Sequence, residues 1–243
     1  MTLLPFVIFG CQQPDDELGG RFLADEVDFG NGTVNMWVEQ DASDRPLNFG
    51  LMGDEILIDD PVDERLEVTL PTPDDIDEVE PYKHFRVYYL PDGHSPSGLD
   101  ISQFKFRAYL VDEDERETLT EADEDERQVE PSAQYLPSGF ELLERDDHPP
   151  VGSQWVSNEI NSNEEGDINY IYAYGFNDGE LVYIETTVSL QALEQNPEAQ
   201  LEIEEPNAFQ KEGFYPQFNF ISYTNDSDEF FISKDQLFFS PAD

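Results

Sequence analysis

The chain has few residues that carry positive charge, and it has a single cysteine. Only 12 of its 243 residues are Lys or Arg, against 56 Asp or Glu, and the formal net charge is −44. A field of this size repels phosphates and anionic headgroups, which excludes nucleic acid as a direct partner. With one cysteine, no disulfide can form within the chain, so the core must be held by packing alone.

Long apolar runs and clustered metal ligands are also missing. The apolar stretch 3–9 is far shorter than the roughly 20 residues that a membrane-spanning helix needs. The three histidines, His84, His94 and His148, are dispersed, and none has the spacing of a zinc site. Aromatic residues, in contrast, make up 13% of the chain. Disordered acidic chains are poor in aromatics, so this composition predicts a folded protein.

The apolar stretch near the N-terminus ends in a small residue and the lone cysteine. Residues Ile8-Phe9-Gly10-Cys11 resemble the lipobox of bacterial lipoproteins, in which an aliphatic, a variable and a small residue precede the cysteine. The resemblance implies that residues 1–10 are a truncated signal peptide and that residues 11–20 are a tether lipidated at Cys11. Gln12, in place of Asp, favours the outer membrane. The alternative is a short apolar N-terminus with an incidental cysteine.

This resemblance gives the protein an expected location and one expected partner. An acylated Cys11 implies export and a lipid bilayer as the partner, on the periplasmic or surface face of a bacterial envelope. Lipid must supply the attachment, because the net charge of −44 opposes electrostatic binding to headgroups.

The acidic excess predicts adaptation to high salt. Self-repulsion destabilises the compact state at low ionic strength. At about 1 M salt the Debye length falls to about 3 Å, which removes most of that repulsion. We therefore expect a saline habitat or a halophilic source. The alternative explanation is that some carboxylates bind divalent cations.

The pattern of apolar residues predicts a mainly β protein. Apolar and polar residues alternate over 34–38, 66–70 and 104–110, as in strands with one buried and one solvated face. Residues 168–176 and 180–187 flank Asn177-Asp178-Gly179 and predict a hairpin. One short helix is predicted at 189–196, and further strands are predicted at 47–51, 55–59, 84–90, 139–144, 200–204, 217–224, 229–233 and 236–240.

Two prolines within 144–153 predict a domain boundary. We expect two antiparallel β-sandwich domains, over 21–145 and 150–243, with immunoglobulin-like size and strand spacing. One larger sandwich or barrel is the alternative. Residues 112–130 carry eleven acids and are predicted to form a solvated loop, with a hairpin tip at 112–116 and a short strand at 117–120.

No stretch carries a complete catalytic or metal-binding signature, and no catalytic residue is assigned. Gly93-His94-Ser95-Pro96-Ser97 differs from a nucleophile elbow because Pro96 has no N–H to offer an oxyanion hole. An EF-hand is excluded because Arg116 and Arg127 stand where ligands belong. An irregular Ca²⁺ site is the alternative for the acidic loops. Its candidate ligands are Asp112, Asp114, Asp123, Asp125, Asn161, Asn163 and Asp167.

Tyrosines are the candidate ligand-binding residues. Tyr170, Tyr172 and Tyr174 share one face of a predicted strand, and Tyr183 lies on the predicted partner strand. Such a row can stack on sugar rings or pack a sheet interface. The sequence therefore predicts a non-enzymatic binding or structural module of the envelope, with a cationic or carbohydrate partner. The alternatives are a hydrolase that uses two carboxylates, and a Ca²⁺-binding adhesion or carbohydrate-binding module.

Overall fold

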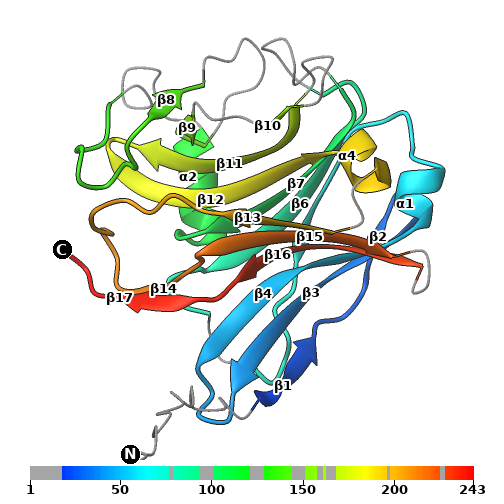
Figure 1. The fold of residues 1–243 in the computed structure, drawn as a ribbon, viewed down its shortest axis with the longest axis horizontal. Helices are drawn as coiled ribbons and strands as arrows, with labels where there is room; N and C mark the ends of the chain where they lie inside the picture. The colour runs from blue at the N-terminus through cyan, green and yellow to red at the C-terminus, as the bar shows by residue number, and fades with distance from the viewer. Residues whose placement is uncertain are drawn as a thin grey trace, which may run out of the picture.

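The protein is a β-sandwich of two antiparallel sheets that enclose one core (Figure 1). The computed structural model describes residues 18–76, 79–93, 101–120, 129–143, 151–157, 161–162, 168–195, 198–224 and 228–243. Within them the prediction of a mainly β protein is confirmed. Outside them lie the lipobox with Cys11, His94, His148, residues 94–97, Asp123, Asp125, Asn163 and Asp167.

Sheet A has its strands in the order β1-β3-β4-β16-β15-β13, and β2 pairs with β3. In the part of the chain that the structure describes, β1 and β13 are therefore its edges. The bounds are β1 (Leu18–Leu23), β2 (Val27–Phe29), β3 (Gly32–Asp41), β4 (Pro46–Asp54), β13 (Glu198–Glu202), β15 (Phe218–Thr224) and β16 (Glu229–Asp235).

Sheet B has the order β5-β6-β7-β12-β11-β9-β8, and β10 pairs with β11. Its strands are β5 (Leu66–Leu70), β6 (His84–Leu90), β7 (Gln103–Tyr109), β8 (Phe140–Leu142), β9 (Ser153–Ser157), β10 (Asn161–Ser162), β11 (Ile168–Asn177) and β12 (Glu180–Ser189). The remaining elements are the small β14 (Gly213–Tyr215) and β17 (Phe238–Ser240) sheet and the helices α1 (Ile56–Asp59), α2 (Glu113–Thr120) and α4 (Leu190–Gln195).

The two halves of the chain share both sheets, so the predicted division into two domains is wrong. In sheet A, β4 pairs with β16, and Leu51 lies opposite Ile232. In sheet B, β7 pairs with β12, and Phe106 lies opposite Thr186. Neither half has the strands to complete a sheet by itself. The two prolines therefore mark a connection inside one sandwich, and no separate immunoglobulin-like domain follows them.

Aromatic side chains from both sheets fill the core. Phe49 of β4 contacts Phe85 and Phe106 of sheet B, with ring centroids 5.4 and 6.2 Å apart. Phe104 of β7 and Phe230 of β16 make a second contact between the sheets, at 5.1 Å. All five rings are buried. Because each buried aromatic contributes about 1.5–3 kcal/mol through the hydrophobic effect, these contacts bind the two sheets into one unit.

The hairpin of β11 and β12 forms at the predicted turn. Asn177 lies opposite Glu180, and the two residues between them have positive φ angles, 49° at Asp178 and 76° at Gly179. A two-residue hairpin turn with this backbone matches the twist of the flanking strands, and Asp-Gly adopts it readily. The sequence signal therefore identified the two strands and the turn that joins them.

Two segments predicted as loop or strand are helical. Residues 55–59 were predicted as a strand, but 56–59 form α1, which buries Leu57 and Ile58. Residues 113–120 form α2 in place of a hairpin tip and strand. Asp112 caps α2, since its carboxylate accepts a hydrogen bond from the N–H of Glu115 at 2.8 Å, and three acids in the first turn favour this end of a helix.

The N-terminal boundary of the sandwich also differs from the prediction. The tether was expected to run to residue 20, but Leu18–Leu23 form β1, which pairs with β3 at the edge of sheet A. None of the helices in the described residues has the length and apolar character that a bilayer crossing requires.

Candidate ligand-binding site

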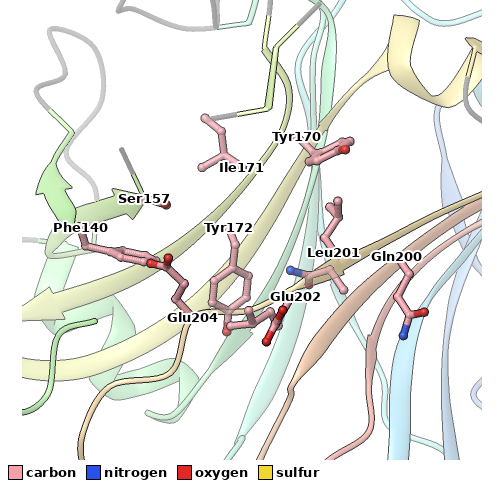
Figure 2. A pocket seen from close by; sticks show the side chains of 11 residues that line it. Phe140, Ser157, Tyr170, Ile171, Tyr172, Gln200, Leu201, Glu202 and Glu204 are labelled. Atoms are coloured by element: carbon pink, nitrogen blue, oxygen red, sulfur yellow. The ribbon is translucent and has the colours of Figure 1, made fainter. Parts of the chain in front are cut away.

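A pocket of about 310 Å³ lies between β11 of sheet B and the edge strand β13 of sheet A. One wall is Tyr170–Tyr172 of β11. The opposite wall is the segment 200–204, which begins in β13. Figure 2 shows Tyr172 with Glu202 and Glu204 near the middle of the lining residues. The pocket is completed by Phe140 of β8, Ser157 of β9 and Asn219 of β15.

The structure brings three of the four candidate tyrosines to this pocket. Tyr170 and Tyr172 line it and are partly exposed. Tyr174 lies behind them, fully buried, with its ring 5.2 Å from that of Tyr172 in an edge-to-face contact. Its hydroxyl donates a hydrogen bond of 3.1 Å to the carbonyl oxygen of Glu204. Burial raises the pKa of Tyr174, so the hydroxyl stays protonated and joins the two walls.

Tyr183 does not belong to the pocket. It lies opposite Gly175, and therefore on the face of sheet B that points away from sheet A. A Cβ at Gly175 would lie 2.1 Å from Cε1 of Tyr183, so the ring occupies the space that a side chain at this position would need. The one-residue bulge between Gly175 and Phe176 shifts the register, which a simple count from the turn does not reveal.

A buried lysine supports the floor of the pocket. Lys234 of β16 is 0% exposed and donates hydrogen bonds to Oδ1 of Asn219, at 2.6 Å, and to Oγ1 of Thr186. Its Nζ lies 4.6 Å from the ring centre of Tyr172. Burial lowers the pKa of Lys234 well below its ordinary value, and Glu185 and Asp235 act in the opposite direction. Because Asn219 and Tyr172 also line the pocket, Lys234 fixes the positions of two lining side chains.

The charged residues that line the pocket are acidic. Among the described lining residues they are Glu202 and Glu204, both exposed, and both come from the same wall. Burial raises the pKa of the Asp235 carboxyl group, but Asp235 does not line the pocket. It accepts a hydrogen bond from Ser233 and follows the inward-facing Lys234, so it lies on the outer face of sheet A. The pocket therefore offers aromatic faces and negative charge.

A second polar cluster covers the outer face of sheet B. Glu185 of β12 is 0% exposed, and it is the only carboxylate that is fully buried among the described residues. It accepts hydrogen bonds from Nε and Nη2 of Arg107, from Nε2 of Gln154 at 2.7 Å and from Oγ1 of Thr187 at 3.0 Å. Nζ of Lys105 lies 3.9 Å away. The alternation in β7 predicted that Lys105 and Arg107 face solvent, and that prediction is wrong because both side chains are buried.

His84 lies at the end of the same face, beneath α2. Its ring stacks on Tyr109 with centroids 4.4 Å apart, and its Nδ1 lies 2.9 Å from the carbonyl oxygen of Val111. Burial lowers the pKa of His84 to about 4. The imidazole is therefore neutral at pH 7, and Nδ1 is the protonated nitrogen that donates to Val111.

The candidate Ca²⁺ ligands that the structure describes do not come together. Asp112 caps α2, Asp114 is exposed in the first turn of that helix, and Asn161 lies in β10. Within the described residues, no group of three or more His, Cys, Asp or Glu side chains is arranged to hold a metal ion.

The sequence reasoning missed Lys234, as it also missed the lining carboxylates of Glu202 and Glu204. For Lys234 a signal existed, because Phe230, Ile232 and Lys234 follow the same period of two and so share the inward face of one strand. The predicted strand ended at 233, two residues before the end of β16 at Asp235, and so left Lys234 out.

Comparison with known proteins gives no family: no family model, no curated protein and no solved structure matches the chain. The functional conclusion therefore depends on the geometry of the pocket and on the sequence around Cys11.

Proposed function

We propose that this chain is a non-enzymatic binding module, held at a bacterial envelope by lipid on Cys11 and adapted to high salt. Its ligand site is the pocket between β11 and β13. The observation that carries the proposal is the pocket itself, which combines the partly exposed rings of Tyr170 and Tyr172 with the carboxylates of Glu202 and Glu204. Aromatic faces and a few convergent polar groups are the usual lining of a ligand site.

The arrangement of the two carboxylates favours binding over hydrolysis. A glycoside hydrolase needs two carboxyl groups on opposite sides of the scissile bond, one of them with a raised pKa. Glu202 and Glu204 come from one wall, and the facing segment 170–172 contributes Tyr, Ile and Tyr. These residues are suited to stacking and to attracting positive charge, which are binding roles.

The strand order suits a tethered module. The chain that leads from Cys11 enters the sandwich at β1, and β13 is the opposite edge of sheet A (Figure 1). Five strand spacings of about 4.8 Å separate these edges, or about 24 Å. The seven residues from Cys11 to Leu18 reach at most about 25 Å when extended. Anchoring at Cys11 would therefore hold the sandwich close to the bilayer by the edge that is farthest from the pocket.

Membrane fractionation of cells that express the full chain tests the anchor. Two or three acyl chains hold a protein stably on a bilayer, so the wild-type chain should pellet with membranes. The Cys11→Ser variant, which cannot be acylated at this position, should be found in the soluble fraction. A Gln12→Ser variant is the matched control, and it should stay with the membrane. If Cys11→Ser still pellets with the membranes, the lipoprotein interpretation is wrong.

A further inference from the structure

The outer edge of β13 has main-chain groups that no described strand pairs with. β13 is hydrogen-bonded to β15 on one side, with Leu201 opposite Asn219. Just beyond the strand, the N–H of Ile203 donates to the carbonyl oxygen of Gln217 at 2.8 Å. In an antiparallel ladder such hydrogen-bonded pairs alternate, so the main-chain groups of Leu201 also face β15.

The main-chain N–H and C=O groups of Gln200 and Glu202 consequently point away from β15, toward the open edge. Glu204 follows the same alternation, and its carbonyl oxygen does point outward, since it accepts a hydrogen bond from Tyr174 of sheet B. The pocket lies along this edge, because the consecutive residues 200–204 all line it. Successive side chains of a strand point to opposite faces, so only a space beside the backbone can touch all of them.

We infer that the open edge of β13 binds an extended peptide segment of a partner protein, rich in Lys or Arg, which adds to sheet A as a further strand. The inference rests on the proposed function and names the ligand class of the same pocket. Main-chain hydrogen bonds to Gln200 and Glu202 would hold the segment, and alternate side chains of the segment would enter the pocket, as in other cases of strand addition.

Charge decides which kind of segment fits. The exposed face of β13 carries Glu198 and Glu202, and Glu204 continues the row past the end of the strand. Like charges directly opposite each other destabilise a strand pair, whereas opposite charges stabilise it. A second copy of β13 would bring glutamates against glutamates, which disfavours self-association at this edge. A Lys or Arg side chain would meet these carboxylates and the rings of Tyr170 and Tyr172.

Calorimetric titration of the soluble Cys11→Ser full chain tests the inference. The probe is a capped seven-residue peptide of alternating Lys and Thr, in about 0.15 M NaCl. The decisive variant is Gln200→Pro, which removes an outward N–H and leaves the ladder with β15 intact, a position where proline is tolerated in an edge strand. We expect it to weaken binding at least about tenfold relative to Gln200→Ala, the matched variant that also removes the side chain but keeps the N–H.

A second pair of measurements separates strand addition from simple attraction to an acidic protein. The same peptide with N-methyl groups on alternate residues has equal charge but cannot complete the ladder, and it should bind at least about tenfold more weakly. Glu202→Gln should weaken binding, while Glu180→Gln, which removes an exposed carboxylate from the β11–β12 hairpin, should not. The methylated peptide keeps the test valid if Gln200→Pro fails to fold.

Two outcomes would overturn the inference. If the N-methylated peptide binds as tightly as its parent, the attraction is nonspecific and strand addition is wrong. If the peptide does not bind but a neutral oligosaccharide does, with Tyr172→Ala abolishing that binding, the ligand class is wrong and the proposed binding module remains. Neither result bears on the membrane anchor, which fractionation of Cys11→Ser tests separately.

Discussion

Removing the charge of Glu185 should destabilise the whole sandwich. Glu185→Gln keeps the size of the side chain but leaves the guanidinium of Arg107 buried without its counter-ion. Leaving one partner of a buried pair uncompensated costs about 3–5 kcal/mol. Domains have a total stability of about 5–15 kcal/mol, so we expect a large fall in the urea midpoint, measured by circular dichroism on the Cys11→Ser chain.

A double-mutant cycle shows whether the loss comes from the pair. Replacing both partners, as Glu185→Met with Arg107→Met, should cost less than the sum of the single variants by about 2–3 kcal/mol. The control is Arg45→Met at the surface pair of Arg45 and Asp41, whose N–O distance is 3.2 Å, and there the loss should be much smaller than for the buried pair. A loss below about 1 kcal/mol for Glu185→Gln, or additive single losses, would refute the reasoning.

The remaining predictions concern salt, pH and packing. The melting temperature of the Cys11→Ser chain should rise with NaCl well beyond 0.15 M, and a flat curve would refute the halophilic interpretation; Ca²⁺ added at the highest NaCl should give a saturable gain only if a specific site exists. Because burial lowers the pKa of His84 to about 4, the histidine binds its proton in the unfolded chain first, and stability should fall by up to about 3 kcal/mol as the pH drops from about 6.5 to 4. Urea unfolding of His84→Phe should lose this part of the pH dependence, and an unchanged pH profile would contradict the assignment. Gly175→Ala should cost about 1–3 kcal/mol, because its Cβ would lie 2.1 Å from the ring of Tyr183, and Tyr183→Leu should reduce that cost in the same assay.

The period-two pattern predicted the strands well because it reflects the backbone directly. The predicted segments 66–70 and 84–90 coincide with β5 and β6, and the Asp-Gly turn predicted the hairpin. The same pattern does not reveal what lies against the polar face. Lys105 and Arg107 alternate with apolar residues as a solvated face would, yet they are buried around Glu185 of a strand 78 residues away.

Features that depend on distant pairing could not be predicted from local sequence. The proline-rich connection resembles a linker, and only the pairing of β4 with β16 and of β7 with β12 shows that it lies within one domain. The tyrosine row was found because three of its members share a strand face, whereas Tyr183 was misplaced by a bulge. The cap at Asp112 was a local signal for α2 that the absence of an apolar stripe concealed.

Because strands from the two halves of the chain pair with each other, the order of synthesis limits when the sheets can form. β4 and β7 are central strands, but their partners β16 and β12 come from the second half of the chain. During synthesis from the N-terminus, both strands therefore emerge long before the residues that will cover their open edges. Unpaired edges of this kind invite association between nascent chains, and the density of like charge on this chain opposes it. Sheet A can therefore be completed only after β16, which ends at Asp235, has left the ribosome.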